Sequence, residues 1–154
     1  MSAIPDPQFD ELFREIILDH YRKPRNRGHL ADATAHAEGM NPVCGDAIEL
    51  DLRLDGEAIN DIAFAGEGCS ISQASASLMT ERLKGRPVDE ARQVTGKFRA
   101  MMMDGAEPDP DLGDLEALQG VAKFPARVKC ALLVWNVLQE ALQQPKPATP
   151  GGPQ

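Results

Sequence analysis

One stretch of strictly alternating residues, 46–54, most constrains the fold of this chain of 154 residues. Its apolar members, which share one face, are Ile48, Leu50, Leu52 and Leu54. Charged residues lie between them. This pattern predicts a half-buried antiparallel strand. Because Asp55-Gly56 supplies a turn sequence, residues 59–65 are expected to form the second strand of a hairpin. A segment around 33–38 is expected to add a third strand.

Helical spacing of apolar residues replaces this alternation elsewhere in the chain. Helices are predicted over residues 8–20, 71–83, 88–102 and 124–143. The first carries one apolar stripe, made of Phe9, Leu12, Phe13, Ile16 and Ile17. Residues 104–113 are expected to form an acidic loop, and 115–118 one short turn. Helices flank a small sheet without βαβ alternation, which predicts an α+β fold with a three-stranded antiparallel sheet packed against four to five helices.

The length of the chain is typical of one domain, expected to span residues 8–143. Residues 1–7 are expected to be flexible. The end of the chain, 144–154, is rich in proline and glycine and is expected to be disordered. No apolar run approaches the roughly 20 residues of a membrane span, and the N-terminus lacks the features of a secretory signal.

The formal net charge of −8 argues against general nucleic-acid binding, which usually depends on a basic surface. An odd number of cysteines, three, without an export signal indicates a reducing, cytoplasmic setting. A basic cluster follows the first helix: Arg22, Lys23, Arg25 and Arg27. We interpret it, like the acidic loop, as solvated surface, and docking of a protein partner by charge is the alternative.

The three cysteines and one aspartate offer four donor groups, the number that a tetrahedral zinc site takes. These candidates are Cys44, Asp46, Cys69 and Cys130. Each cysteine alone also has a structural interpretation, because a free cysteine is usually a small buried hydrophobic residue. The spacings of 25 and 61 residues between the cysteines match no zinc-finger pattern. The local sequence around each residue therefore decides its interpretation.

Cys44 lies on a loop bounded by Pro42 and Gly45, directly before the alternating strand. A Cys-Gly-Asp turn can direct the thiolate and the carboxylate of Asp46 to one point, since glycine has no Cβ to clash there. Asp46 can equally be a turn or cap residue. The loop is nevertheless the most adaptable place among the three cysteine sites.

Cys69 follows a Gly-Glu-Gly segment at the expected start of a helix, where the partial positive charge favours a thiolate. Ser70 or Ser72 can equally be the helix cap. Cys130 lies inside the last helix, with Arg127 one turn earlier and Lys129 adjacent. Nearby cations would lower the pKa of the Cys130 thiol and offset the negative charge of a set of thiolate and carboxylate ligands.

A core cysteine flanked by two solvent-reaching cations is the structural alternative for Cys130. The three histidines have no metal-ligand spacing to a cysteine and are expected at the surface or at caps: His20, His29 and His36. The chain contains neither a GxxxxGK[ST] phosphate loop nor a GxSxG nucleophile elbow.

Four segments, in order, closely resemble the SufU branch of the IscU/NifU-type iron–sulfur assembly proteins, across residues 8–142. They are Leu18–Asn26, Asn41–Asp46, Gly66–Ser72 and Phe124–Cys130. The IscU scaffold branch has a histidine directly before the third cysteine, where this chain has Lys129. The chain also has the additional sequence, around 95–120, that SufU proteins carry between the second and third cysteines.

The resemblance implies a SufE/NifU-like fold and a firmly held Zn²⁺ whose ligands are Cys44, Asp46, Cys69 and Cys130. It implies a zinc-dependent sulfurtransferase that accepts persulfide sulfur from a PLP-dependent, SufS-like cysteine desulfurase and serves downstream iron–sulfur scaffold proteins. SufU-like proteins are thought to exchange a zinc ligand with the partner, which here would free Cys44. Cys44 is then the catalytic thiol, and Arg127 is expected to steer or stabilise the persulfide.

Two alternatives remain open at the level of the sequence. The first is a scaffold on which a [2Fe–2S] cluster assembles, because thiolates with a carboxylate also hold iron. Lys129 in place of histidine disfavours this alternative. The second is a purely structural zinc with four closed ligands, which would leave the Cys44 loop and Arg127 without a role.

Overall fold

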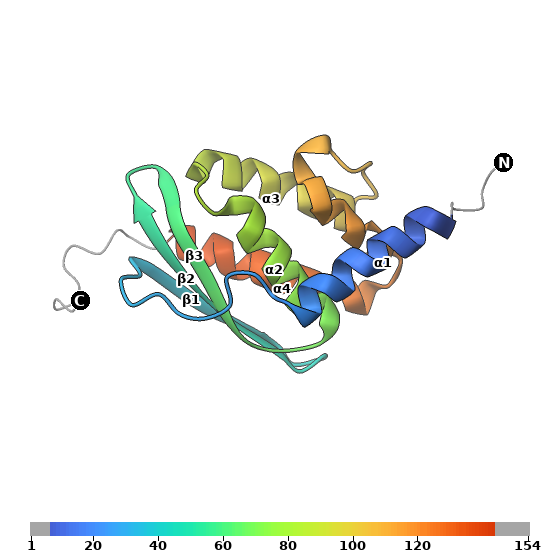
Figure 1. Cartoon of the computed structure of the whole chain (residues 1–154), viewed down its shortest axis with the longest axis horizontal. Helices are drawn as coiled ribbons and strands as arrows, with labels where there is room; N and C mark the ends of the chain where they lie inside the picture. The colour runs from blue at the N-terminus through green and yellow to red at the C-terminus, as the bar shows by residue number, and fades with distance from the viewer. Residues whose placement is uncertain (1–6, 144–154) are drawn as a thin grey trace.

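The computed structural model describes residues 7–143 of the chain as three strands, four α-helices and one 3-10 helix. In chain order they are α1 (Pro7–Arg22), β1 (Ala35–Asn41), β2 (Asp46–Asp55), β3 (Ala58–Glu67), α2 (Ser70–Leu83), α3 (Val88–Met103), the 3-10 helix η1 (Pro110–Lys123) and α4 (Pro125–Gln143). The strands form one sheet, and the helices lie mainly on one side of it (Figure 1). The predicted α+β class is confirmed.

The alternating segment is the central strand of the sheet, since β2 pairs antiparallel with both β1 and β3. Ile48, Leu50 and Leu52 are fully buried on the face that meets the helices, as the alternation predicts. Gly56 turns the β2–β3 hairpin with φ of 62°, a value that glycine adopts without a steric penalty. The hairpin and the third strand are therefore both present.

The segment between α1 and β1, residues 26–34, crosses the outer face of the sheet (Figure 1). At its start, the Gly28 N–H donates to the Phe64 carbonyl on β3 (2.7 Å). Further on, the Leu30 N–H donates to Oδ2 of Asp51 on β2 (2.9 Å). This crossing segment covers part of the outer face and leaves the part nearest the β1–β2 turn uncovered.

The helix α4 lies directly against the sheet and forms the centre of the core. Its Trp135 is fully buried and stacks on Phe98 of α3, with ring centroids 4.6 Å apart. A Cβ on Gly39 of β1 would come within 2.7 Å of Cγ2 of Val137, so glycine allows helix and strand to touch. One cluster of buried apolar residues joins the sheet and the helices.

The helix α2 presents small polar residues to its neighbours. Oγ of Ser77 forms a hydrogen bond with Nδ1 of His20 (2.7 Å) and accepts the N–H of Arg25 (2.8 Å). Oγ1 of Thr80 accepts from Nδ2 of Asn26 (3.2 Å). This polar network fastens α1 and the chain after it to α2. Two guanidinium groups of the basic cluster also bond within the chain, Arg25 to Asp19 (2.7 Å) and Arg27 to Gln73 (2.7 Å), so the cluster is partly engaged in structure.

The predicted apolar stripe of the first helix is only partly buried. Ile16 and Ile17 pack against the core, but Leu12 is 53% exposed, and the side chain of Phe9 lies outside the described part. The apolar contacts of α1 with the core are described for its C-terminal half, which lies beside α2 and η1 (Figure 1).

The prediction of one short turn at 115–118 is wrong, because η1 extends over Pro110–Lys123 with a break at Gly113. The Asp109 carboxylate begins this helix by accepting the N–H of Asp111 (2.8 Å). Its buried apolar residues recur at every third position: Leu112, Leu115, Leu118 and Val121. That spacing suits the three residues per turn of a 3-10 helix.

The predictions for residues 1–7 and 144–154 fall outside the described part, apart from Pro7, which begins α1. The single-domain boundaries at 8 and 143 stay a prediction. Within residues 7–143, no helix is both long enough and apolar enough to cross a bilayer.

Candidate metal centre

Cys44 lies in the turn, residues 42–45, that joins β1 to β2. Its N–H donates to the carbonyl of Asn41 (3.2 Å). Gly45 completes the turn with φ of 73°, in the left-handed region that favours glycine. The side chain of Cys44 is half-buried, and that of its neighbour Val43 is 71% exposed. The predicted loop position of this thiol is therefore present at the protein surface.

Asp46 opens β2 and turns its carboxylate inward, where the residue is only 1% exposed. Its Oδ1 accepts the N–H of Cys69 (2.9 Å). A Cβ on Gly68 would come within 2.5 Å of this same oxygen. Glycine at position 68 thus lets the β3–α2 junction approach the carboxylate closely. Asp46 therefore links the start of β2 to the start of α2, besides following the turn.

Cys69 occupies the N-cap of α2, and its carbonyl accepts the N–H of Gln73 (3.1 Å). Neither serine is the cap: Ser70 is the first residue of the helix, and Oγ of Ser72 donates to the Cys69 carbonyl (3.2 Å). The thiol of Cys69 makes no capping hydrogen bond, so it is not used by the helix itself.

Cys130 is fully buried on α4, and its Sγ lies 2.9 Å from Sγ of Cys44. The carbonyl of Ala126 faces both thiols, at 3.7 Å from Cys130 and 3.9 Å from Cys44. One ligand atom from each of Cys44, Asp46 and Cys130 lies within 4.8 Å of the other two. Three of the four predicted donors therefore meet: two come from the turn and start of β2, and the third comes from α4. Cys44 and Cys130 are 86 residues apart in sequence.

The fourth predicted donor, Cys69, is not one of that group of three. It adjoins the group through the backbone hydrogen bond to Asp46, and its thiol is among the neighbours that act on Cys130. Its role as a ligand stays a prediction.

Burial raises the pKa of the Cys130 thiol far above its ordinary value, and the thiol of Cys44, the carboxyl of Asp46 and the thiol of Cys69 add to this shift. The expectation that flanking cations lower this pKa is wrong. Arg127 and Lys129 both point to solvent, where their charge is screened, whereas Cys130 is desolvated.

The structure does not bring Arg127 into contact with the thiols. Its backbone N–H donates to the Phe124 carbonyl (2.8 Å), but within residues 7–143 its guanidinium forms no hydrogen bond or ion pair. The predicted catalytic role of Arg127 is not tested by these contacts and stays a prediction.

Asn41 is a buried member of the site to which the sequence analysis gave no role. Its Nδ2 lies 3.5 Å from Oδ2 of Asp46 and 3.8 Å from Sγ of Cys130. The two residues are paired across the β1–β2 register, Asn41 opposite Asp46. That pairing is the signal that could have identified it, because residues flanking a short turn in a hairpin face each other.

One expectation for the histidines is also wrong: His20 is buried in the polar network rather than at the surface. Burial lowers its pKa, and the nearby charge of Arg25 adds to the effect. The other two histidines lie on or beside the outer face of the sheet, near Asp51.

The donor set fits zinc. Zinc takes thiolate sulfur and carboxylate oxygen at about 2.0–2.3 Å in tetrahedral sites, which places two ligand atoms about 3.3–3.8 Å apart. The two thiol sulfurs are 2.9 Å apart and all three ligand atoms lie within 4.8 Å of one another, so small side-chain shifts would bring them to this spacing. The cluster is closed on the inside by α4 and open on the side of the Cys44 turn.

Comparison with known proteins places the chain among close relatives. It matches the NifU-like N-terminal domain over residues 12–131. Over 135 residues it is 50% identical to the zinc-dependent sulfurtransferase SufU of Bacillus subtilis, covering 86% of this chain and 90% of that protein. It is 41% identical to the iron–sulfur cluster assembly scaffold protein IscU of Streptococcus pyogenes, covering 89% of this chain and 86% of that protein.

A solved structure shares the fold. The crystal structure of the iron–sulfur cluster assembly scaffold protein for the SUF system of Fervidobacterium islandicum AW-1 superposes with a TM-score of 0.79. The two chains are 37% identical, and the match covers 84% of this chain and 95% of that one. The two proteins therefore share the fold of a three-stranded sheet with its helices.

Proposed function

The chain belongs to the family of NifU-like N-terminal domains, and on that premise we propose that it acts in iron–sulfur cluster assembly as a zinc-dependent sulfur acceptor. Its partner is a PLP-dependent cysteine desulfurase, and downstream scaffold proteins receive the sulfur. The observation that carries the proposal is the convergence of the ligand atoms of Cys44, Asp46 and Cys130.

The proposed zinc ligands are these three side chains and Cys69. Bound Zn²⁺ would hold the thiols as thiolates, which the buried Cys130 cannot easily become alone. The relative from Bacillus subtilis is named as zinc-dependent, and this supports the choice of metal. Free thiols of this kind need a reducing compartment, so we place the protein in the cytoplasm.

Cys44 is the proposed acceptor. Its thiolate attacks the terminal sulfur of the desulfurase persulfide, a new S–S bond forms on Cys44, and the S–S bond on the desulfurase breaks. The desulfurase cysteine leaves as a thiolate, so the transfer consumes no oxidant or reductant. The turn position supports this choice, because Cys44 can leave the cluster by moving four turn residues, whereas Cys130 is fully buried in the second turn of α4.

The surface around Cys44 suits a protein partner. Exposed apolar side chains adjoin the cluster in sequence: Met40, Val43 and Phe124, which are 73%, 71% and 57% exposed. Arg127 is exposed in the same first turns of α4 and has no partner among the described residues, so its guanidinium is available to an incoming persulfide.

A scaffold for a [2Fe–2S] cluster is the second candidate. Relatives named as IscU scaffolds favour it, and the same donor set can hold iron. The histidine expected of that branch is replaced by Lys129, which points to solvent. We therefore rank the scaffold below the sulfur acceptor.

The first test is Cys44→Ala with the desulfurase from the same organism. We expect the variant to fold but to lose all stimulation of sulfide release, because no thiolate remains in the β1–β2 turn. Met103→Ala is the control, since it truncates an exposed apolar side chain outside the Cys44 turn and removes no thiol, and it should keep the full stimulation. Full sulfur transfer by Cys44→Ala would move the acceptor role to another cysteine.

The second test is the metal content and visible spectrum of protein purified anaerobically. One zinc per chain in a colourless sample is expected. Iron with acid-labile sulfide and a brown colour would favour the scaffold instead. Asp46→Ala should lower the zinc content, and an unchanged affinity would remove this residue from the ligand set.

A further inference from the structure

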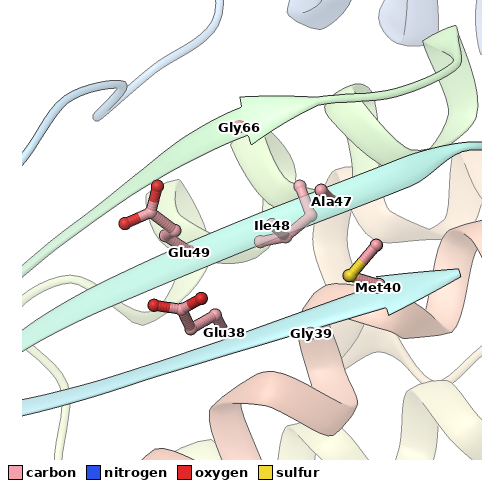
Figure 2. A pocket seen from close by; sticks show the side chains of 7 residues that line it. All are labelled: Glu38, Gly39, Met40, Ala47, Ile48, Glu49 and Gly66. Atoms are coloured by element: carbon pink, nitrogen blue, oxygen red, sulfur yellow. The ribbon is translucent and has the colours of Figure 1, made fainter.

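The outer face of the sheet carries a second group of metal-binding side chains, on the same two strands that lead into the Cys44 turn. On β1, His36 and Glu38 point outward, and β2 places Asp51 and Glu49 directly opposite them in the register. Figure 2 shows the carboxylates of Glu38 and Glu49 side by side on neighbouring strands. The crossing segment leaves this part of the face uncovered.

The donor atoms of this group lie close together. One ligand atom from each of His36, Glu38 and Glu49 lies within 4.8 Å of the other two. Nε2 of His36 is 3.2 Å from Oε2 of Glu38. Within residues 7–143, the side chain of Glu49 forms no hydrogen bond or ion pair, and no lysine or arginine pairs with Glu38. Two like charges placed directly opposite in a sheet repel, so a cation between them would relieve an unfavourable contact.

A separate residue orients the imidazole. Asp51 is only 6% exposed, and its Oδ1 lies 2.6 Å from Nδ1 of His36. Its Oδ2 accepts the N–H of Leu30 (2.9 Å), and Nδ1 of His29 is 3.4 Å away, so the carboxylate is itself held in place. Metal-binding histidines commonly have this arrangement, in which a carboxylate holds one ring nitrogen and the other nitrogen faces the ion.

The surroundings leave room for a hydrated ion. Glu38 and Glu49 line a hollow of about 470 Å³, together with Met40, Ala47 and Gly66 (Figure 2). The small residues Ala47 of β2 and Gly66 of β3 keep the hollow open. Three protein donors in an open hollow leave further coordination positions to water.

We propose that His36, Glu38 and Glu49 form a thiol-free site for a divalent first-row cation, with Asp51 as the residue that positions His36. One imidazole nitrogen and two carboxylate oxygens suit Mn²⁺, Fe²⁺ or Zn²⁺ and need no soft ligand. Water completes the coordination, so binding is weak and exchangeable, with a Kd on the order of 10⁻⁴ M, as for other open carboxylate sites. The site shares no ligand with the cysteine cluster, and the proposal does not rest on the function proposed above.

The test loads the cysteine cluster with one equivalent of zinc and then titrates Mn²⁺, with free Mn²⁺ followed by electron paramagnetic resonance. Mn²⁺ is the probe because it prefers carboxylate and imidazole to thiolate. One saturable Mn²⁺ per chain is expected. Glu38→Gln with Glu49→Gln should weaken this binding at least tenfold and leave the zinc content at one per chain.

A matched control is Asp55→Asn with Glu57→Gln, which removes the same charge at the exposed β2–β3 turn and should bind Mn²⁺ as the unaltered protein does. Asp51→Asn should weaken binding about tenfold, as loss of such a supporting carboxylate commonly does. Equal Mn²⁺ binding by the two double variants, or no saturable binding at all, would overturn the site. His36 would then simply bridge carboxylates as an ion pair.

Discussion

The helix α2 contacts two groups of buried polar side chains, and the two are satisfied in opposite ways. Along its middle, Ser77 and Thr80 meet His20 and the chain after α1 in a network of hydrogen bonds of 2.7–3.3 Å. At its N-terminus, Cys69 adjoins Cys130, whose thiol faces other thiols and a carboxyl group. The first group is complete within the chain, whereas the second gains from a cation.

The difference lies in the donors. Hydroxyl, amide and imidazole groups can each give and accept a hydrogen bond, so a network of them can satisfy every member. Thiols hydrogen-bond weakly, and packing three of them near a carboxylate raises the pKa of the buried one. A metal replaces their protons and removes that cost. A structural network and the proposed metal centre can thus share one helix.

The largest effect that separates the two groups is expected from Cys130→Ala and Ser77→Ala. Zinc contributes about 10–16 kcal/mol across four ligands, so loss of one ligand should weaken zinc binding about 100- to 1,000-fold. Ser77→Ala should keep zinc affinity and lower the free energy of unfolding by about 1–3 kcal/mol, because His20 and the Arg25 N–H lose their shared partner. Competition with a chromophoric chelator and urea unfolding measure the two effects. Loss of zinc by the Ser77→Ala variant would show that the two groups are not independent of each other.

An intermediate effect is expected from Gly68→Ala. The added Cβ would meet both Oγ of Ser72 and Oδ1 of Asp46. The serine hydroxyl can rotate away, but the carboxylate would be pushed from the thiols, weakening zinc binding about 10- to 100-fold. The control is Gly96→Ala in α3, where no atom lies within 4 Å of the new Cβ. It should keep zinc affinity and gain up to about 1 kcal/mol of stability, because alanine favours a helix. Equal zinc affinities for the two variants would show that Asp46 is not held by this close approach.

The smallest effect concerns the pH dependence of the polar network. Burial and Arg25 lower the pKa of His20, while Glu81, Asp19 and Asp114 oppose the shift. The folded state therefore binds fewer protons than the unfolded state just below pH 6.5, so stability is full above about pH 6.5 and falls as the pH drops through the lower folded pKa.

His20→Asn should flatten this dependence by up to about 1 kcal/mol between pH 7.5 and 5.5, as measured by urea unfolding. Zinc affinity should not change with the substitution. A variant with the same slope as the unaltered protein would assign the acid sensitivity to another group.

The parts of the fold that depend on local periodicity were predictable. The alternation at 46–54 and the apolar spacing of the helices describe contacts with a nearby core, which each segment can signal alone. The spacing of three in η1 is equally local, but it matches the three residues per turn of a 3-10 helix, so a search for the 3.6-residue period of an α-helix finds only a short turn there.

The site was predictable only in its composition. Cys44 and Asp46 belong to one turn, whereas their approach to Cys130 joins positions 86 residues apart, which no spacing rule gives. The burial of His20 has the same origin, since its partner Ser77 is 57 residues away. The pKa of Cys130 was misjudged for a related reason: sequence neighbours suggested cations, but depth in the fold decided the outcome.

The crossing segment has one more consequence, for self-association. An open three-stranded sheet exposes the backbone groups of its edge strands, and these can recruit strands from other chains. Along β3, Phe64 bonds to the crossing segment, and Ile59 exchanges hydrogen bonds with the loop after α2. The edge that would otherwise invite amyloid-like stacking is thereby blocked at both ends by the chain's own loops.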